Sequence, residues 1–443
     1  MVEVSEQRTA GAKRRRVAAA TKGQMTEAGD RMTEVREQMA VVSRQLSAEE
    51  RPRVLVYSNE FPQTGSAGGL LLDRLFKDYP ADLVRIVGPA PQRASAPLRF
   101  THHEISIPWS KFEHSRFNKW HRTLRSYGLV PLAQPQVVDT LLGGFSPEVV
   151  LTVMQHGTWY DSAMRFAETK KLPLVTIVHD DNEGFDRVFA WARGAQRERD
   201  GIFYRYASRR FCVSPEMEEE FRRRYGVPGE VLYPNRSEDL TARDADWNLS
   251  LRTPGRLTLG FVGNPNYGYG EQLVKMLPAI REAGARLLIW GHQPGGAAAP
   301  LVDATDVVEL RGFVPSAQAW DEVKRECDAV VFPYLAPPDA MERMYSIHFP
   351  SKLPEYLALG MPIVMVGPDE ATGVRWARRN PEAVLMLNAA DPGSWAAEFR
   401  RLAADPQLRS SLGAGALEAG ARDFDPVAIR KKFQNALSVE AVA

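Results

Sequence analysis

Apolar residues along the chain alternate between short continuous runs and longer stretches in which they recur every three or four positions. The continuous runs predict buried strands and the periodic stretches predict helices. The expected strands are 53–58, 83–88, 148–154, 173–180, 211–214, 257–263, 286–291, 306–314, 328–334 and 362–367, and the expected helices include 70–79, 270–283, 316–326 and 426–438. This alternation predicts an α/β protein with parallel sheets covered by helices on both faces.

A polar stretch without periodicity, residues 235–255, divides the strands and helices into two series and is interpreted as a linker between domains. We therefore expect two doubly wound, Rossmann-like domains at 51–245 and 246–425, followed by a closing helix at 426–443. Ligands of such domains bind at the carboxyl ends of the strands, so two of them facing each other would form a binding cleft.

Residues 1–50 contain no aromatic residue, unlike the rest of the chain. Apolar residues spaced by three or four form a short heptad seam at 32–46: Met32, Val35, Met39, Val42 and Leu46. We expect a helical extension packed on the body behind a disordered tail. A homodimer through 32–46 is the alternative, although two repeats are short for a stable coiled coil.

The composition narrows the class of protein. The formal net charge is +1 over 443 residues, which gives no overall field for nucleic acid. Cys212 and Cys327 stand in apolar contexts and are expected to be reduced core thiols of a cytoplasmic protein. No apolar run is long enough for a transmembrane helix, and no apolar stretch follows the basic residues 13–16 as a signal peptide requires.

The stretch FPSKLPEYLALGMPIV (349–364) carries the clearest candidate chemistry. Ser351 is expected to cap a short helix that Gly360 ends. The free amide groups of a helix N-terminus attract phosphate, and Lys352 adds a positive charge beside them. Glu355 lies one turn further and can accept hydrogen bonds from a sugar diol. The alternative interpretation is a solvated lysine–glutamate pair.

Several strand ends would surround this helix. GFVGN places Gly263 and Asn264 after one strand, and LLIWGH ends another at Gly291 and His292. RGFVP, with Phe313 and Val314, stands where backbone groups could recognise a base. A long loop at 333–348 leads into the helix and contains Tyr334, Arg343 and His348 as further candidates.

Taken in order, FVGN, LLIWGH, RGFVP, AVVFPY and SKLPEYLALGMPIV resemble the C-terminal half of GT-B glycosyltransferases of group 1, the family 4-like kind. The likeness covers 257–437 well and 53–234 more loosely. It implies a C-terminal domain that binds a nucleotide sugar, an N-terminal domain that binds the acceptor, and a last helix that returns to the N-terminal domain. Glu355 matches the ribose-binding glutamate, and Ser351 and Lys352 match a phosphate-binding pair of enzymes similar to the xanthan-type glucuronosyltransferase.

Two positions depart from that family's usual pattern. Ile347 stands where an earlier glutamate normally contacts the donor sugar. The loop NPNYGYGEQ, which follows FVG, has no basic residue before Lys275. The charge of the phosphates is therefore expected to fall on Lys352, with Arg343 or His348 as additional candidates.

The N-terminal half has counterparts to the family's other site elements. NEFPQTGSAGG (59–69) resembles its first glycine-rich loop, with Gly65, Gly68 and Gly69 as the glycines, although an ordinary strand-to-helix turn is the alternative. VTIVHDD ends a strand with the catalytic candidates His179, Asp180 and Asp181. Side chains alternate along a strand, so His179 and Asp181 should share one direction and Asp180 should oppose them, unless the turn re-aims them. His156 is a further candidate.

Residues 109–129 interleave aromatic and basic side chains, with the apolar positions at roughly helical spacing. The segment is expected to be a helix packed on the N-terminal domain, or alternatively a surface that meets an anionic membrane or a lipid-linked acceptor. Aromatic residues among basic ones also suit single-stranded nucleic acid, but the neutral charge of the chain argues against that partner. No His, Cys or Asp cluster has the spacing of metal ligands, so we expect no metal and no cofactor beyond the donor.

The sequence and the resemblance thus predict a cytoplasmic GT-B glycosyltransferase of the hexosyltransferase type. It would move a sugar from a nucleotide diphosphate to an acceptor hydroxyl in polysaccharide or glycoconjugate synthesis, peripheral to the inner face of the membrane if 109–129 binds lipid. The alternatives are a non-catalytic GT-B-like protein that binds nucleotide or polysaccharide, and a nucleotide-sugar epimerase. The sequence does not fix the donor sugar, the acceptor or the stereochemical course.

Overall fold

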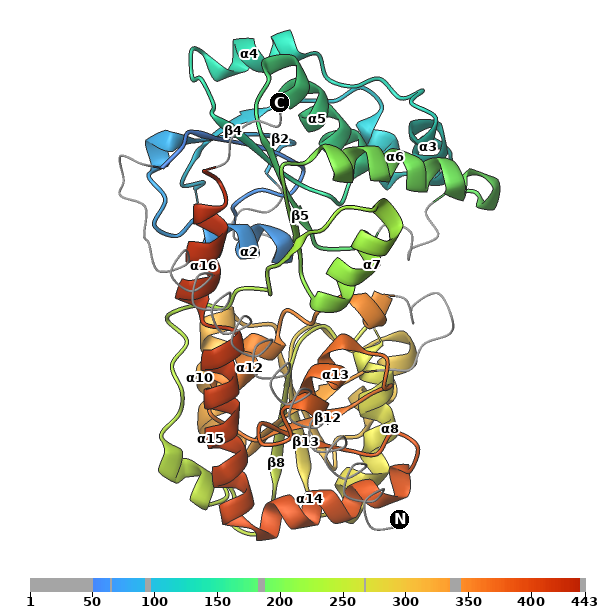
Figure 1. Cartoon of the computed structure of the whole chain (residues 1–443). Coiled ribbons are helices and arrows are strands. Elements are labelled where there is room, and N and C mark those ends of the chain that lie inside the picture. Colours follow the sequence, from blue (N-terminus) through green and yellow to red (C-terminus); the bar gives the residue numbers. More distant parts are fainter. Residues whose placement is uncertain are drawn as a thin grey trace, which may run out of the picture. The chain divides into compact units, whose positions relative to one another are not determined.

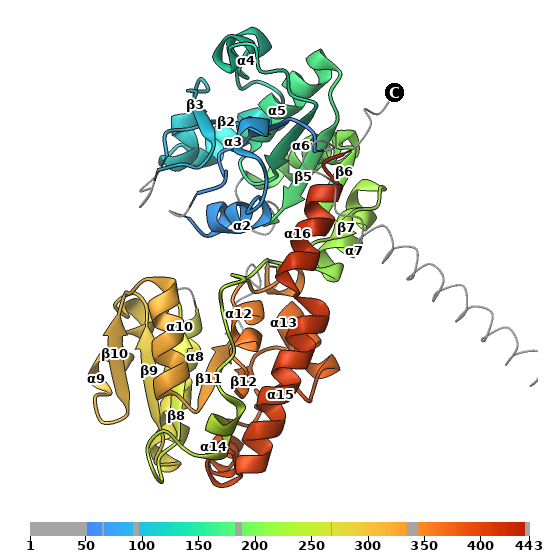
Figure 2. The same ribbon diagram turned by 90° about the vertical axis from the view of Figure 1, so that its left-hand side faces the viewer.

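The computed structural model describes residues 51–63, 66–91, 97–181, 188–266, 268–334 and 344–438. The predicted seam at 32–46 lies outside these residues. From Arg51 onward the chain forms one compact unit, which contains two parallel sheets. We call the part built on the first sheet the first lobe and the part built on the second sheet the second lobe (Figures 1 and 2).

The first lobe is built on seven parallel strands in the order β3-β2-β1-β4-β5-β6-β7. The strands are β1 (Val54–Tyr57), β2 (Val84–Gly88), β3 (Thr101–Glu104), β4 (Val149–Val153), β5 (Leu174–Val178), β6 (Arg209–Cys212) and β7 (Glu230–Val231). Every residue of β1, β4 and β5 is buried, as expected for strands with helices on both faces. The helices are α2 (Ala67–Leu75), α3 (Asn118–Ser126), α4 (Pro135–Leu142), α5 (Gly157–Lys170), α6 (Arg193–Tyr206) and α7 (Pro215–Tyr225).

The second lobe is built on six parallel strands in the order β10-β9-β8-β11-β12-β13. The strands are β8 (Thr258–Val262), β9 (Arg286–Trp290), β10 (Val308–Gly312), β11 (Ala329–Pro333), β12 (Ile363–Val366) and β13 (Val384–Met386). Its helices are α8 (Tyr269–Glu282), α9 (Pro300–Asp303), α10 (Ser316–Glu326), α12 (Leu353–Ala358), α13 (Thr372–Arg379), α14 (Trp395–Ala404) and α15 (Pro406–Asp423). In each sheet the strand order reverses beside the first strand, between β1 and β4 and between β8 and β11. A doubly wound sheet binds ligands at that point.

The last described helix, α16 (Pro426–Asn435), packs on α2 of the first lobe, as Figure 2 shows. The ring of Phe433 meets that of Phe76 edge to face at a centroid distance of 5.3 Å. The side-chain amide of Gln434 donates a hydrogen bond of 2.9 Å to the carbonyl of Leu75. The last described helix thus contacts the first lobe.

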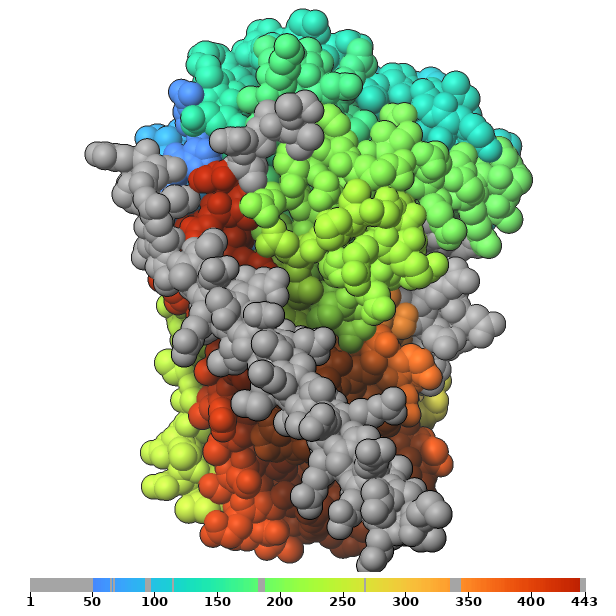
Figure 3. Space-filling model, viewed as in Figure 1, coloured from blue at the N-terminus to red at the C-terminus, as the bar shows by residue number. Residues whose placement is uncertain are grey.

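The two lobes also meet through α7 and α13. Arg375 and Arg379 of α13 lie 3.6 and 3.8 Å from the carboxylate of Glu216 at the start of α7. Figure 3 shows the yellow-green surface of the α7 region directly above the orange surface of the second lobe. These contacts add to α16 in joining the lobes.

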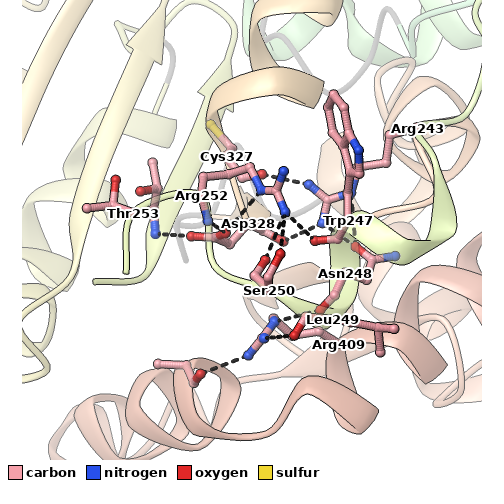
Figure 4. A network of polar contacts seen from close by, with 12 residues as sticks. Arg243, Trp247, Asn248, Leu249, Ser250, Arg252, Thr253, Cys327, Asp328 and Arg409 are labelled. Carbon is pink, nitrogen blue, oxygen red and sulfur yellow. Dashed lines mark hydrogen bonds and ion pairs between the residues drawn. The ribbon is translucent and has the colours of Figure 1, made fainter. Parts of the chain in front are cut away.

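The polar stretch predicted as a linker is anchored to the second lobe (Figure 4). The carboxylate of Asp328 accepts hydrogen bonds of 2.7 Å from the backbone amides of Arg252 and Thr258. Arg243 donates to the carbonyl of Cys327 at 2.7 Å, and Arg409 of α15 donates to the carbonyl of Asn248 at 2.9 Å. Buried arginines thus donate hydrogen bonds to backbone carbonyl groups, whose partners the sequence alone does not identify.

Two predictions about elements are corrected. The segment 109–129 is not one helix, because Trp109 has a left-handed backbone (φ 65°) and a short 3-10 helix at Ser110–His114 precedes α3. The edge strands β3, β7 and β13 were not predicted, since they are short and only partly buried. Among the helices that the structure describes, none combines the length and the apolar character that a membrane-spanning helix requires.

Candidate active site

Three cavities lie around the start of α12, and the first is formed by both lobes. Cavity 1 measures about 450 Å³. The first lobe contributes residues that follow β1, β4 and β5, among them Glu60, Gln155, His179 and Asp180, and the second lobe contributes Tyr334, Tyr345, His348 and Ser351. Carboxylate, imidazole and amide groups therefore face an aromatic wall, a combination that suits a sugar ring.

Cavity 2 measures about 220 Å³ and lies within the second lobe. It is lined by Gly263 and Asn264 after β8 and by Lys352 and Tyr356 at α12. A Cβ atom at Gly291 would lie 1.7 Å from the carbonyl oxygen of Gly263, so only glycine permits this approach of two strand ends. Pro350 and Ser351 line both cavity 1 and cavity 2, which are therefore adjacent.

Cavity 3 measures about 420 Å³ and lies between α2, the segment 236–241 and α10. Its lining includes Arg74, Lys77, Arg236, Trp320 and Lys324. Charged side chains of both signs thus surround this cavity.

Helix α12 is short, and its cap differs from the prediction. The helix begins at Leu353, and Lys352 already has a right-handed helical backbone (φ −87°, ψ −17°) at the N-cap position. Ser351 therefore precedes the cap and makes no capping hydrogen bond, which corrects the expected role of its hydroxyl. Gly360 does end the helix with a positive φ of 66°, as expected.

Glu355 is buried and pairs with the first lobe. Its Oε1 accepts a hydrogen bond of 2.7 Å from Nη2 of Arg74 on α2, and the two side chains are 8% and 17% exposed. The alternative of a solvated lysine–glutamate pair is therefore wrong. Nζ of Lys352 lies 5.7 Å from the ring centroid of Trp320. Burial lowers the pKa of Lys352, the charge of Glu355 opposes this, and the charge of Arg74 adds to it.

The three candidates at the end of β5 occupy different environments. His179 and Asp180 line cavity 1, whereas the carboxylate of Asp181 makes two contacts of 2.8 Å with the guanidinium of Arg224 and is buried. The strand ends at Val178. The chain turns there, which is the exception that the sequence analysis allowed, and His179 and Asp180 rather than His179 and Asp181 share a direction. Asp181 holds α7 in place, and its proposed catalytic role is not supported by this position.

Asp180 is held between two other polar groups. Its carboxylate accepts a hydrogen bond of 3.3 Å from the amide of Gln155 and lies 3.4 Å from Nδ1 of His348. Nε2 of His348 accepts a hydrogen bond of 2.8 Å from the backbone amide of Asp181. Neutral His348 therefore carries its proton on Nδ1, facing Asp180. Burial lowers the pKa of His179, the charge of Asp180 opposes this and that of His348 adds to it, and Nε2 of His179 has no hydrogen-bond partner.

Glu60 is a residue of this site that the sequence analysis did not single out. It lines cavity 1, accepts a hydrogen bond of 2.8 Å from the hydroxyl of Ser66, and has a pKa raised by burial. A Cβ atom at Gly68 would lie 3.0 Å from Oε2 of Glu60, and one at Gly69 would lie 2.5 Å from Cγ of Gln63. The glycines thus bring α2 close to the loop that carries Glu60. Gly65 lies outside the described residues.

The remaining candidates lie away from the three cavities. Nδ1 of His156 is 3.3 Å from the buried carboxylate of Glu113, which also accepts a hydrogen bond of 2.7 Å from the hydroxyl of Thr158. His292 and Phe313 contact each other with ring centroids 5.4 Å apart, and Phe313 is 76% exposed. Val314 packs against the core.

Arg343 lies outside the described residues. Within those residues, no group of three or more His, Cys, Asp or Glu side chains is arranged to hold a metal ion.

Both halves of the chain match known protein families. Residues 256–405 match the family described as "Glycosyl transferases group 1", and residues 82–235 match the "Glycosyl transferase 4-like domain". Together the two matches cover more than half of the chain. No curated protein sequence matches it.

Solved structures share the fold at low sequence identity. HepE (Alr3699) of Anabaena in complex with UDP has 16% identity and a TM-score of 0.64 over 87% of this chain and 99% of that one. The sucrose-phosphate synthase of Thermosynechococcus elongatus has 14% identity and a TM-score of 0.59 over 86% and 97% of the two chains. The lipopolysaccharide outer core galactosyltransferase WaaB has 12% identity and a TM-score of 0.55 over 87% and 99%. These similarities establish a GT-B fold.

Proposed function

The chain belongs to the group 1 glycosyltransferases, and from that premise we propose that it transfers a sugar from UDP to a hydroxyl group of a second sugar without a metal ion or cofactor. Transfer of a sugar from a nucleotide donor follows from the family. The choice of UDP is supported by the solved HepE structure, which contains UDP. The choice of a sugar acceptor is supported by the aromatic and polar lining of cavity 1.

One observation carries this proposal: cavity 2 adjoins cavity 1 at Pro350 and Ser351. A diphosphate beside Lys352 in cavity 2 would place the bond between sugar and phosphate near this shared wall. A hydroxyl group in cavity 1 could then reach the sugar beside His179 and Asp180. Glu355, one turn further along α12, would accept hydrogen bonds from the ribose.

Charge moves between the two cavities during such a transfer. The acceptor oxygen forms a bond to the anomeric carbon, whose bond to the diphosphate breaks, and the diphosphate leaves with the bonding electrons. Lys352 stabilises the negative charge that develops on it. If configuration is inverted, the carboxylate of Asp180 takes the hydroxyl proton, because it lines cavity 1 and is held by Gln155 and His348.

The aromatic side chains of the 109–129 segment support a second, finer proposal: peripheral binding to the cytoplasmic face of an anionic membrane. The ring centroids of Trp120 and Phe189 are 4.7 Å apart, and those of Phe189 and Trp191 are 6.0 Å apart. Trp120 and Trp191 are 54% and 64% exposed. Nζ of Lys119 lies 5.4 Å from the ring centroid of Phe189, so a positive charge accompanies the exposed rings, as at membrane interfaces.

Vesicle sedimentation tests this membrane proposal. The double variant Trp120→Ser, Trp191→Ser should lose binding to vesicles that contain phosphatidylglycerol. The matched control is Trp247→Ser, since Trp247 is also exposed but lies in the anchored stretch of the second lobe. Equal vesicle binding by the wild type, the double variant and Trp247→Ser would contradict the proposal. The dimer through 32–46 stays a prediction.

A donor screen tests the main proposal. The protein is incubated in EDTA with a panel of UDP-sugars, each with and without mono- and oligosaccharide acceptors, and release of UDP and the sugar products are measured. We expect UDP release that depends on an acceptor. Conversion of the nucleotide sugar to its epimer without an acceptor would favour the epimerase, and binding without any reaction would favour a non-catalytic protein.

A further inference from the structure

Three cationic side chains, Arg74, Arg236 and Lys352, interact with the carboxylate of Glu355. Arg74 hydrogen bonds to it at 2.7 Å and donates a second hydrogen bond of 2.8 Å to the carbonyl of Asn235. The next residue, Arg236, lines cavity 3 with Arg74, and its buried Nε has no hydrogen-bond partner. Lys352 lies on the other side, over the ring of Trp320, which also lines cavity 3.

Four acidic side chains line cavity 3, and each interacts with a cation outside the group around Glu355; the charge of Asp73 acts on Arg99. Glu238 pairs with Arg430 of α16 and lies 3.4 Å from Lys77, which is also 3.6 Å from Asp239. Asp321 lies 3.0 Å from Lys324. Asp425, whose charge acts on Arg236, caps α16 by accepting a hydrogen bond of 2.7 Å from the amide of Ala428. The group around Glu355 therefore carries an excess of positive charge.

The burial of this positive charge changes the pKa of two of the cations. Burial lowers the pKa of Arg236, the charges of Asp425 and Glu355 oppose this, and the charge of Arg74 adds to it. The charge of Arg74 also lowers the pKa of Lys352, after burial itself. Buried cations that lower one another's pKa are stabilised when an anion binds between them.

The loop after β8 offers no cation for this purpose. Asn264, Pro265 and Asn266 follow the strand, and the first basic side chain, Lys275, is exposed and lies 3.5 Å from Glu271. A nucleotide sugar bound with its ribose at Glu355 and its phosphates near Lys352 would carry the two negative charges of its diphosphate into the group of three cations.

We propose that Arg74 and Arg236 bind the diphosphate of the donor together with Lys352, and that the nucleoside extends into cavity 3 beside Trp320. This inference rests on the proposed function and assigns diphosphate binding to two residues that lie outside the second sheet. A guanidinium suits the task because its planar donors match phosphate oxygens. Arg74 belongs to α2 of the first lobe, so the donor would contact both lobes when it binds.

The test compares a nucleoside diphosphate with its nucleoside. Binding of UDP and of uridine is measured by calorimetry for the wild type, Arg74→Gln, Arg236→Gln and the control Lys275→Ala. Glutamine at position 74 keeps a hydrogen-bond donor for Glu355 but removes the charge. Lys275 is an exposed lysine of the second lobe that lies 3.5 Å from Glu271 and lines none of the three cavities.

We expect each glutamine variant to bind UDP about 10- to 100-fold more weakly, with uridine affinity changed less than about threefold. Lys275→Ala should bind both as the wild type does. Melting temperatures are measured in parallel. Arg74→Lys keeps the positive charge and replaces any variant that does not fold. Arg74→Lys should lose UDP affinity only in part.

Two results would overturn the inference. Equal losses for UDP and uridine would mean that the arginines only position Glu355, and unchanged UDP affinity would place the phosphates elsewhere. A folded wild type that does not bind UDP would overturn the proposed function as well. Since that last outcome is seen in the wild type alone, failure of the inference and failure of the function are distinguishable.

Discussion

Replacing Glu355 by glutamine should weaken nucleoside binding more than diphosphate binding. The variant keeps the shape of the side chain and removes one negative charge. The ribose loses hydrogen bonds to a charged acceptor, which are worth about 1.5–3 kcal/mol. That free energy corresponds to about 10- to 150-fold in the dissociation constant of uridine.

The diphosphate experiences a second effect with the opposite sign. In the wild type, the buried carboxylate 2.7 Å from Arg74 offsets part of the positive charge around it. Opposite charges at about 4 Å attract by about 4 kcal/mol at an effective dielectric constant of 20. Without the negative charge of Glu355, the cations attract the phosphates more strongly. Part of the binding free energy that is lost at the ribose is therefore regained at the diphosphate. UDP affinity should therefore fall by clearly less than uridine affinity.

Competition calorimetry with uridine and UDP measures both quantities. Glu271→Gln is the control, because Glu271 is exposed on α8, lies 3.5 Å from Lys275, and lines none of the three cavities. Thermal unfolding should show a loss of about 1–3 kcal/mol for Glu355→Gln, since a partner of the mostly buried Arg74 is weakened. Uridine affinity equal to that of the wild type would refute the assignment of Glu355 to the ribose.

Four further changes separate catalytic groups from structural ones. Asp180→Asn should lower turnover by about 10²- to 10⁴-fold while UDP affinity stays within about twofold, as steady-state kinetics and calorimetry measure; normal turnover would point to Glu60 instead. Asp181→Asn should lower the free energy of unfolding by about 3 kcal/mol through Arg224, with turnover per folded molecule unchanged; reduced turnover in a fully folded variant would contradict this. Burial would raise the pKa of Glu113, but hydrogen bonds from His156 and Thr158 and the charge of His156 outweigh it and lower that pKa to about 2. The stabilisation from the Glu113 carboxylate is therefore present above pH 4.5 and lost as the pH falls towards 2. In denaturant titrations, Glu113→Gln should lower the free energy of unfolding by about 3 kcal/mol at pH 7 and by little at pH 2. A difference that does not depend on pH would contradict this prediction. Deletion of residues 1–50 should leave turnover of a soluble acceptor unchanged, and a collapse of turnover at constant melting temperature would assign that segment to the active site.

The sequence predicted the interior strands because burial on both faces produces continuous apolar runs. β1, β4 and β5 lie within the predicted ranges, and α10 (Ser316–Glu326) has the bounds that its periodicity predicted. The edge strand β3 (Thr101–Glu104) consists of Thr, two His and Glu, with none of the four residues buried, so no apolar pattern marks it.

Site residues were predictable where a local pattern carries them and not where the fold joins distant segments. Lys352, Ser351, His179 and Asp180 all line cavities, and each stands in a short motif. Arg74 is an ordinary helical residue in the sequence and meets Glu355 across 281 positions of the chain. Glu60 stands within the glycine-rich segment 59–69, so a carboxylate three residues after the end of β1 was the signal that could have identified it.

The central claim is that cationic side chains at the start of α12, and not a metal ion, stabilise the departing diphosphate. Its most direct test is the turnover of wild type and Lys352→Ala on a UDP-sugar and acceptor identified by the screen, in the presence of EDTA, with donor affinity measured alongside. We predict that the wild type remains active in EDTA and that Lys352→Ala lowers turnover more than it lowers donor affinity, because the charge grows as the bond breaks. Loss of wild-type turnover on chelation, or normal turnover of Lys352→Ala, would contradict the account.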